Sequence, residues 1–198
     1  MENSSKKTYI LVCDIGGTRL RVCLAELDLE SYEYKILKIE RHVTNEFKSF
    51  QEFYHLKFIE NVAAEFHPTM AVIGIAGVVY NNKAKSSNII WREIDGNELA
   101  IELKLKKVLI VNDIEAIGLG VITLDNSELI PVNNVVKRDY KPIYVMCPGT
   151  GFGGGFLVPD FKGPHSYEGW ASESGHANHG TISGVQEEYA QFLKLCFF

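Results

Sequence analysis

The sequence has few cysteines, no excess of positive charge and no long apolar run, and each of these absences excludes a class of protein. Its four cysteines lie far apart without a C-x-x-C pair, and three fall in predicted strands, which indicates reduced, buried thiols. The formal net charge of −5 disfavours nucleic acid or an anionic membrane as a partner. No segment is long enough to span a bilayer, and the apolar run from Tyr9 is too short for a signal peptide. We therefore expect a cytoplasmic protein.

What is present begins with a hairpin pattern over Tyr9–Leu27. An apolar run ends at Asp14, Gly16-Gly17-Thr18 follows, and the chain then alternates between apolar and charged residues. This alternation predicts a second strand, whereas a dinucleotide fingerprint or a P-loop requires a helix here. Paired glycines allow backbone N–H groups to converge on a phosphate and allow a positive φ. An ordinary tight turn is the alternative interpretation.

The same construction occurs a second time. An apolar run over Ile143–Cys147 leads into the glycine-rich segment Pro148–Gly155, and Phe156–Val158 resumes as a strand. A repeated phosphate-type hairpin indicates two related half-domains that face one nucleotide. Two such turns favour phosphate binding over the tight-turn interpretation.

The rest of the sequence alternates between strand and helix patterns, which predicts an α/β protein with a mixed sheet. One helix begins at Ser49, where Ser49 and Glu52 form a capping-box pair. The patterns predict strands over Tyr32–Ile39, Met70–Ala76 and Val108–Val111, helices over Ser49–Phe66, Asp95–Leu105, Ile114–Leu124 and from Val185 onward, and a polar loop over Asn81–Asn88.

Two polar clusters are candidates for chemistry. Asn112 and Asp113 follow a buried strand, at the end where α/β sheets bind ligands, so the Asp113 carboxylate is placed to accept a proton from a substrate hydroxyl. The two residues are equally suited to cap the next helix. Glu173 and His176 are spaced to present hydrogen-bonding groups to a polyhydroxylated ligand. His176 and His179 have a zinc-like spacing, but no cysteine lies near them, so zinc is disfavoured.

Four motifs together carry a family resemblance. They are Asp14-Ile-Gly-Gly-Thr18, Asn112-Asp113 with Glu115-Ala116, Gly149-Thr-Gly-Phe-Gly-Gly-Gly155 and Glu173-Ser-Gly-His176. In order and approximate spacing they resemble the bacterial-type glucokinases, hexose kinases of the actin-like, ribonuclease-H-like ATPase superfamily. The resemblance implies a ribonuclease-H-like α/β fold with flanking helices: an N-terminal small domain over residues 1–140 and the start of a large domain over residues 141–198.

The resemblance also implies a reaction, the ATP-dependent phosphorylation of glucose at its 6-hydroxyl as the first step of glycolysis, with Mg²⁺. Asp113 would be the catalytic base, and Asp14 would hold the Mg²⁺ directly or through water. The phosphate-binding residues would be Asp14, Ile15, Gly16, Gly17, Thr18, Gly149, Thr150, Gly151 and Gly153. The glucose-binding residues would be Asn88, Asn112, Asp113, Glu173 and His176.

The sequence departs from the family pattern in two places. Ser174 occupies a position where the family usually has glycine, and the chain stops well before the family's adenosine pocket, so we expect a C-terminally truncated glucokinase whose second half-domain is incomplete. The alternatives are a non-catalytic sugar-binding or vestigial protein and a kinase for another hexose. The resemblance also admits a homodimer.

Overall fold

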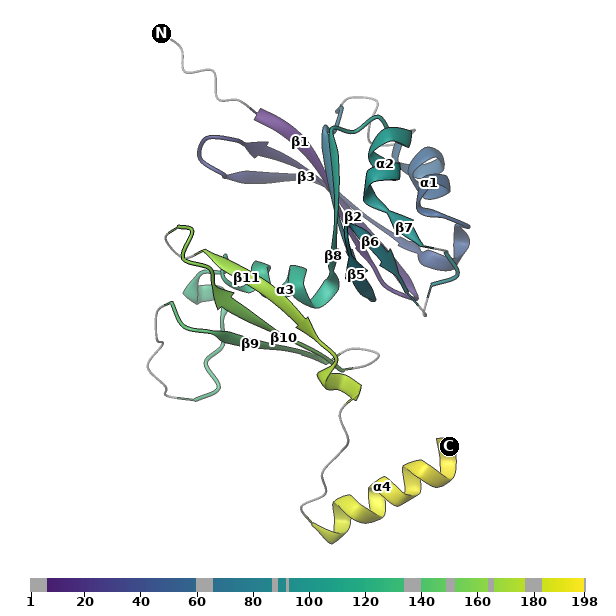
Figure 1. Ribbon diagram of the computed structural model, residues 1–198, viewed down its shortest axis with the longest axis vertical. Coiled ribbons are helices and arrows are strands. Elements are labelled where there is room, and N and C mark those ends of the chain that lie inside the picture. Colours follow the sequence, from purple (N-terminus) through teal and green to yellow (C-terminus); the bar gives the residue numbers. More distant parts are fainter. Residues whose placement is uncertain are drawn as a thin grey trace.

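The computed structural model describes residues 7–59, 66–86, 89–91, 93–133, 140–148, 152–163, 166–176 and 183–197. Its main sheet has five strands in the order β3-β2-β1-β4-β8 (Figure 1). The strands are β1 (Lys7–Ile15), β2 (Arg19–Asp28), β3 (Tyr34–Val43), β4 (Met70–Ile75) and β8 (Lys107–Asn112). β2 pairs with β1 and β3 antiparallel, whereas β4 pairs with β1 and β8 parallel. The predicted mixed sheet and the first hairpin are thus confirmed.

The core lies on one face of this sheet. The alternation in β2 buries Leu20, Val22 and Leu24 and leaves Arg19 and Arg21 exposed. The elements over this face are α1 (Phe50–Phe53), the π-helical η2 (Tyr54–Ile59) and α2 (Gly96–Glu102), and Figure 1 shows α1 and α2 on the same side of the sheet. Phe50, Phe53 and Leu99 from these elements pack against the buried strand residues.

The cysteines of the described segments are free thiols. Cys13 is buried, Cys23 and Cys147 are partly buried, and the Cys196 side chain lies outside the described residues. Burial raises the pKa of the Cys13 thiol far above its ordinary value, which keeps it protonated and unreactive.

The helix predicted over Ser49–Phe66 begins where expected and then changes character. Ser49 caps it, because its Oγ accepts the Glu52 N–H at 3.1 Å, while the Glu52 carboxylate accepts the Lys48 N–H. After one α-helical turn the chain widens into η2, and residues 60–65 lie outside the described part. Over so few residues, apolar spacing does not distinguish a π-helix from an α-helix.

The loop predicted over Asn81–Asn88 is partly wrong, because its first half belongs to a hairpin. β5 (Val78–Tyr80), β6 (Lys83–Lys85) and β7 (Ile94–Asp95) form a small antiparallel sheet. Asn81 and Asn82 connect β5 and β6 with φ values of 49° and 60°. Positive φ at both central residues is the signature of a type I′ hairpin turn, which asparagine tolerates. The Asn-Asn pair could therefore have predicted this hairpin turn from the sequence.

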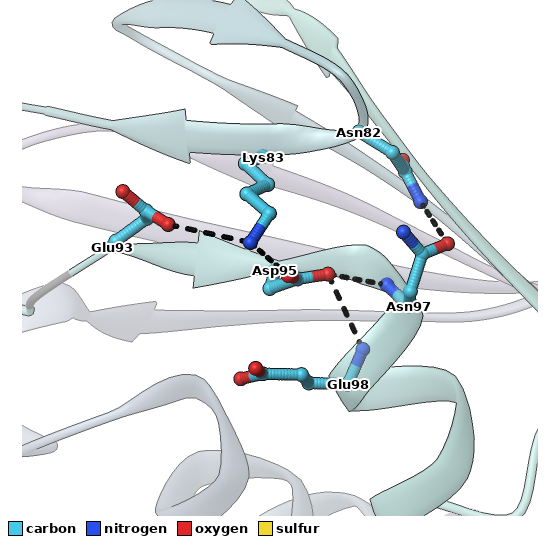
Figure 2. A network of polar contacts seen from close by, with 6 residues as sticks. All are labelled: Asn82, Lys83, Glu93, Asp95, Asn97 and Glu98. Carbon is cyan, nitrogen blue, oxygen red and sulfur yellow. Dashed lines mark hydrogen bonds and ion pairs between the residues drawn. The ribbon is translucent and has the colours of Figure 1, made fainter.

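Polar contacts fasten this small sheet to its surroundings (Figure 2). Lys83 Nζ lies 2.7 Å from Asp95 Oδ2, and Asp95 Oδ1 accepts the Asn97 and Glu98 N–H groups at the start of α2. The Asn82 side chain reaches β8, where its Nδ2 donates to the Val108 carbonyl at 2.9 Å. Its Oδ1 accepts the Ile110 N–H at 2.8 Å. Asn82 thereby occupies backbone groups on the outer edge of β8.

A second sheet of three strands, β11-β10-β9, lies beyond α3 (Asp113–Val121) (Figure 1). α3 follows β8 directly and packs on this second sheet. Its strands are β9 (Ile143–Pro148), β10 (Phe152–Pro159) and β11 (Tyr167–Ser172), all antiparallel. The predicted second hairpin is confirmed, while β11 was not predicted. The remaining described helical elements are η1 (Thr44–Glu46), η3 (Asn126–Glu128), η4 (Ser174–His176) and α4 (Gly184–Phe197).

None of the helices in the described ranges combines the length and apolar character needed to cross a bilayer. α4 confirms the helix predicted from Val185 onward, and its Val185, Tyr189 and Phe192 side chains are exposed. The domain division at residue 140 stays a prediction.

Candidate functional site

The tip of the first hairpin is a tight turn that a backbone hydrogen bond closes. The Gly16 N–H donates to the Arg19 carbonyl at 2.9 Å, and Ile15 pairs with Leu20 at the last rung of the ladder. The Ile15 side chain is fully buried, so this predicted phosphate residue can contribute only through its backbone. No glycine among the described residues has a positive φ. A Cβ at Gly16 would lie 3.3 Å from the Arg19 carbonyl oxygen, a tight contact that glycine avoids.

Asp14 lies next to this tip, and its carboxylate interacts electrostatically with that of Asp113. Partial burial raises the pKa of the Asp14 carboxyl, Arg21 opposes this from 3.4 Å, and the Asp113 carboxylate raises the pKa further. Asp14 and Arg21 are both more than half exposed, so their ion pair contributes little to stability. Asp14 thus combines a partly desolvated carboxylate with a second carboxylate, that of Asp113, close enough to repel it, and Arg21 offsets these effects only in part. One or two carboxylates together with substrate phosphates are the set by which Mg²⁺ is usually held, so these residues fit that ion.

The raised Asp14 pKa predicts a stability gain for Asp14→Asn in the ligand-free protein. A carboxyl whose pKa is raised by folding disfavours the folded state once it ionises, so the cost is present at pH 7 and absent below about pH 4. Urea denaturation should show Asp14→Asn to be more stable than wild type at pH 7 and indistinguishable from it at about pH 4. The same substitution should weaken Mg-ATP binding.

Asp28 is the matched control, because its pKa shift has the opposite sign. Backbone N–H groups of Glu30 and Ser31 donate to the Asp28 carboxylate and lower its pKa. Asp28→Asn should therefore reduce stability at pH 7, and the difference should disappear as the pH falls. Equal behaviour of the two variants would contradict the electrostatic description of Asp14.

Asn112 and Asp113 connect the end of β8 to the start of α3. Asn112 is the N-cap: its Oδ1 accepts the Ile114 and Glu115 N–H groups at 2.9 and 3.3 Å, and its Nδ2 donates to the Gly77 carbonyl at 3.0 Å. The capping interpretation therefore holds for Asn112, which leaves one amide N–H for a ligand. Asp113 is half-buried and accepts the Ile114 N–H at 2.9 Å.

The second hairpin packs on α3 through its glycines. A Cβ on Gly153 would lie 2.3 Å from Ile114 Cδ1, and one on Gly155 would lie 2.9 Å from Ile114 Cγ2. Gly153 therefore has a packing role, and its predicted phosphate contact stays a prediction. The contact places the β10 end of the hairpin beside the residue that follows Asp113.

The turn that carries Glu173 is bound to the same hairpin. Ser174 Oγ lies 2.9 Å from the Tyr144 hydroxyl, and Ser172 Oγ donates to the Gly154 carbonyl at 2.8 Å. Gly175 packs against Phe152, whose carbonyl oxygen leaves no room for a side chain at that position. Glu173 itself is exposed. Ser174, the departure from the family pattern, thus has a defined partner.

Several predicted site residues lie wholly or partly outside the described residues. Asn88, Gly149, Thr150 and Gly151 lie outside the described residues, as does the His176 side chain, although the His176 backbone belongs to η4. Three residues after position 88 in the sequence, Trp91 is buried and its Nε1 donates to the Phe47 carbonyl at 2.6 Å. One residue at the site was not predicted: Thr44, which contacts the first hairpin tip from η1.

The five-stranded mixed sheet, the two glycine-rich hairpins and the helix between them give the chain an actin-like, ribonuclease-H-like α/β fold, and solved structures of glucokinases match this fold. A glucokinase from an Antarctic psychrotroph has a TM-score of 0.74 at 24% identity, over 96% of this chain and 57% of that one. A ROK family glucokinase from Streptomyces griseus has a TM-score of 0.58 at 20% identity, over 87% of this chain and 51% of that one.

The chain belongs to the glucokinase family, because the Glucokinase family model matches residues 11–197. A glucokinase from Nostoc sp. is 30% identical over 186 residues, which cover 94% of this chain and 53% of the relative. The chain therefore spans about half the length of the curated relatives it matches.

Proposed function

We propose that this chain carries the phosphate-binding hairpins and the catalytic carboxylate of an ATP-dependent hexose kinase that phosphorylates glucose at its 6-hydroxyl. The observation that carries the proposal is the position of Asp113, at the carboxyl end of β8 and the N-terminus of α3. From there its carboxylate is close enough to Asp14, on the phosphate-type hairpin, to raise the pKa of that residue. Family membership and the ligands of the Streptomyces griseus glucokinase, which was solved in complex with glucose and AMPPNP, support the choice of substrates.

In this mechanism Asp113 accepts the proton of the sugar 6-hydroxyl as that oxygen attacks the γ-phosphorus. Asn112 holds the start of α3 in place and has an N–H left for the sugar. Glu173 and His176, on the turn bound to β10, and Asn88 would hold the remaining hydroxyls. Little covalent chemistry is required of the protein in phosphoryl transfer, so positioning and charge neutralisation account for most of the catalysis.

The phosphates would lie between the two hairpins. The Gly17 and Thr18 N–H groups and the Thr18 hydroxyl would bind them from the first hairpin, because the Gly16 N–H already donates to the Arg19 carbonyl. Residues 149–151 and 153 would bind them from the second hairpin. Asp14 would hold Mg²⁺, directly or through water, and the ion would neutralise charge on the β- and γ-phosphates. Burial, together with the Asp113 carboxylate, raises the pKa of Asp14, and a cation bound there would oppose that shift.

The test is sugar-dependent formation of ADP by the purified chain, measured in a coupled assay with ATP and Mg²⁺. We expect turnover with glucose, and a panel of mannose, fructose and N-acetylated hexoses ranks the substrates by kcat/KM. Calorimetric titration of glucose and of Mg-ATP accompanies the assay. Glucose binding without ADP formation would favour the non-catalytic alternative, and a better kcat/KM for another hexose would reassign the substrate.

A further inference from the structure

Thr44 is a polar residue with no exposed surface that lies directly beneath the first hairpin tip. It follows the last residue of β3 and begins η1, and its exposed fraction is 0%. A buried hydroxyl is costly unless it is hydrogen-bonded. The Thr44 hydroxyl is bonded, and its partner belongs to the residues that the proposed function places on phosphate.

Two hydrogen bonds from Thr44 hold two carbonyls of the tip. Its Oγ1 donates to the Gly16 carbonyl at 2.8 Å, and its backbone N–H donates to the Thr18 carbonyl at 3.1 Å. One residue thus fixes the Gly16–Gly17 peptide and the Thr18–Arg19 peptide, which lie on either side of the Gly17–Thr18 peptide. The backbone bond continues the pairing of β2 with β3, whereas the side-chain bond is specific to a hydroxyl at this position.

The side-chain bond determines which way an N–H group points. In a planar trans peptide the C=O of one residue and the N–H of the next point in opposite directions. Because the Gly16 carbonyl points at the buried Thr44 hydroxyl, the Gly17 N–H points away from the core. Without that donor, the peptide between Gly16 and Gly17 is free to rotate, since glycine offers little steric resistance.

We propose that Thr44 is a positioning residue for nucleotide binding: its hydroxyl holds the Gly16–Gly17 peptide so that the Gly17 N–H is presented to the phosphates of ATP. The inference rests on the proposed function. It assigns Thr44 no contact with ATP, so its effect must appear in nucleotide affinity while sugar affinity stays unchanged.

The experiment compares variants that differ by one hydroxyl. Thr44→Val should weaken Mg-ATP binding by about 3- to 10-fold, the range expected for one lost hydrogen bond. Thr44→Ser should restore affinity to near the wild-type value. If valine's extra methyl prevents folding, the pair Thr44→Ala and Thr44→Ser isolates the same oxygen. Calorimetric Kd values for Mg-ATP and for glucose, with urea denaturation of each variant, are the measurements.

Thr8→Val is the matched control. Thr8 lies at the opposite end of β1, and its Oγ1 is 2.7 Å from Thr69 Oγ1, so the substitution also removes a half-buried hydroxyl bond from the same sheet. It should lower stability and leave the Kd for Mg-ATP unchanged.

The outcomes separate the two hypotheses. Wild-type protein that binds no Mg-ATP overturns the proposed function and the role of Thr44 with it. Wild-type binding that is matched by Thr44→Val, or lost equally in Thr8→Val, overturns the role of Thr44 alone. A parallel loss of glucose affinity would show a general structural defect and would also contradict the inference.

Discussion

Asp113→Asn is expected to reduce kcat for sugar phosphorylation by about 10²- to 10⁴-fold, the usual contribution of a positioned general base. The amide has the shape of the carboxylate and can still accept the Ile114 N–H, so α3 should begin at the same residue. Its neutral oxygen cannot take up the proton of the attacking hydroxyl. Glucose should still bind, because Asn112 and the turn that carries Glu173 are unaltered. Steady-state kinetics and calorimetric titration of glucose measure the two effects separately.

Asp125→Asn is the control, since it removes the same charge by the same isosteric change. Asp125 caps η3, where its carboxylate accepts the Ser127 N–H at 2.7 Å, and no predicted site residue lies in that turn. Its kcat should equal that of wild type. A kcat for Asp113→Asn within about threefold of wild type would remove Asp113 as the base, because a general base contributes far more.

Phe53→Ala is expected to lower the free energy of unfolding by about 3–5 kcal/mol, the range for truncating a buried aromatic side chain. Phe53 is completely buried, and its ring centroid lies 5.2 Å from those of Phe47 and His42 and 5.9 Å from that of Phe50. Alanine would leave a cavity at the centre of the layer between α1 and the main sheet. Urea denaturation with unchanged m-value measures the loss.

Phe161→Ala provides the comparison at the surface. Phe161 is 79% exposed and its ring contacts that of Tyr140 at a centroid distance of 5.3 Å, so its truncation should cost less than about 1 kcal/mol. Similar losses for the two variants would mean that the aromatic layer around Phe53 does not form the core.

The hairpins and helix starts could be predicted because their signals are local. Alternation after Thr18 determined which β2 side chains are buried, and the caps at Ser49, Asp95 and Asn112 act on N–H groups two or three residues away. For the same reason Asn112 could not be assigned to capping or to sugar binding alone. Its cap is local, whereas any ligand contact depends on segments far away in sequence.

The interactions that could not be predicted join distant segments. Thr44 contacts Gly16 across 28 residues, and no pattern around Thr44 marks it as a partner of the hairpin. Gly153 and Gly175 were interpreted from their phosphate and sugar motifs, yet their packing on Ile114 and Phe152 is decided by tertiary contacts. The strand β11 was missed because its alternation includes Gly169, whose lack of a side chain makes room for Glu115 of α3.

The side chain of Asn82 has a consequence for self-association. An edge strand with free N–H and C=O groups is a template for pairing with another chain. Asn82 already occupies the Val108 carbonyl and the Ile110 N–H, so an incoming strand would have to displace two hydrogen bonds before it could pair with β8 there. Asn82 therefore protects this edge against strand addition and aggregation, while β3, at the other edge of the sheet, remains the side from which the sheet could be extended.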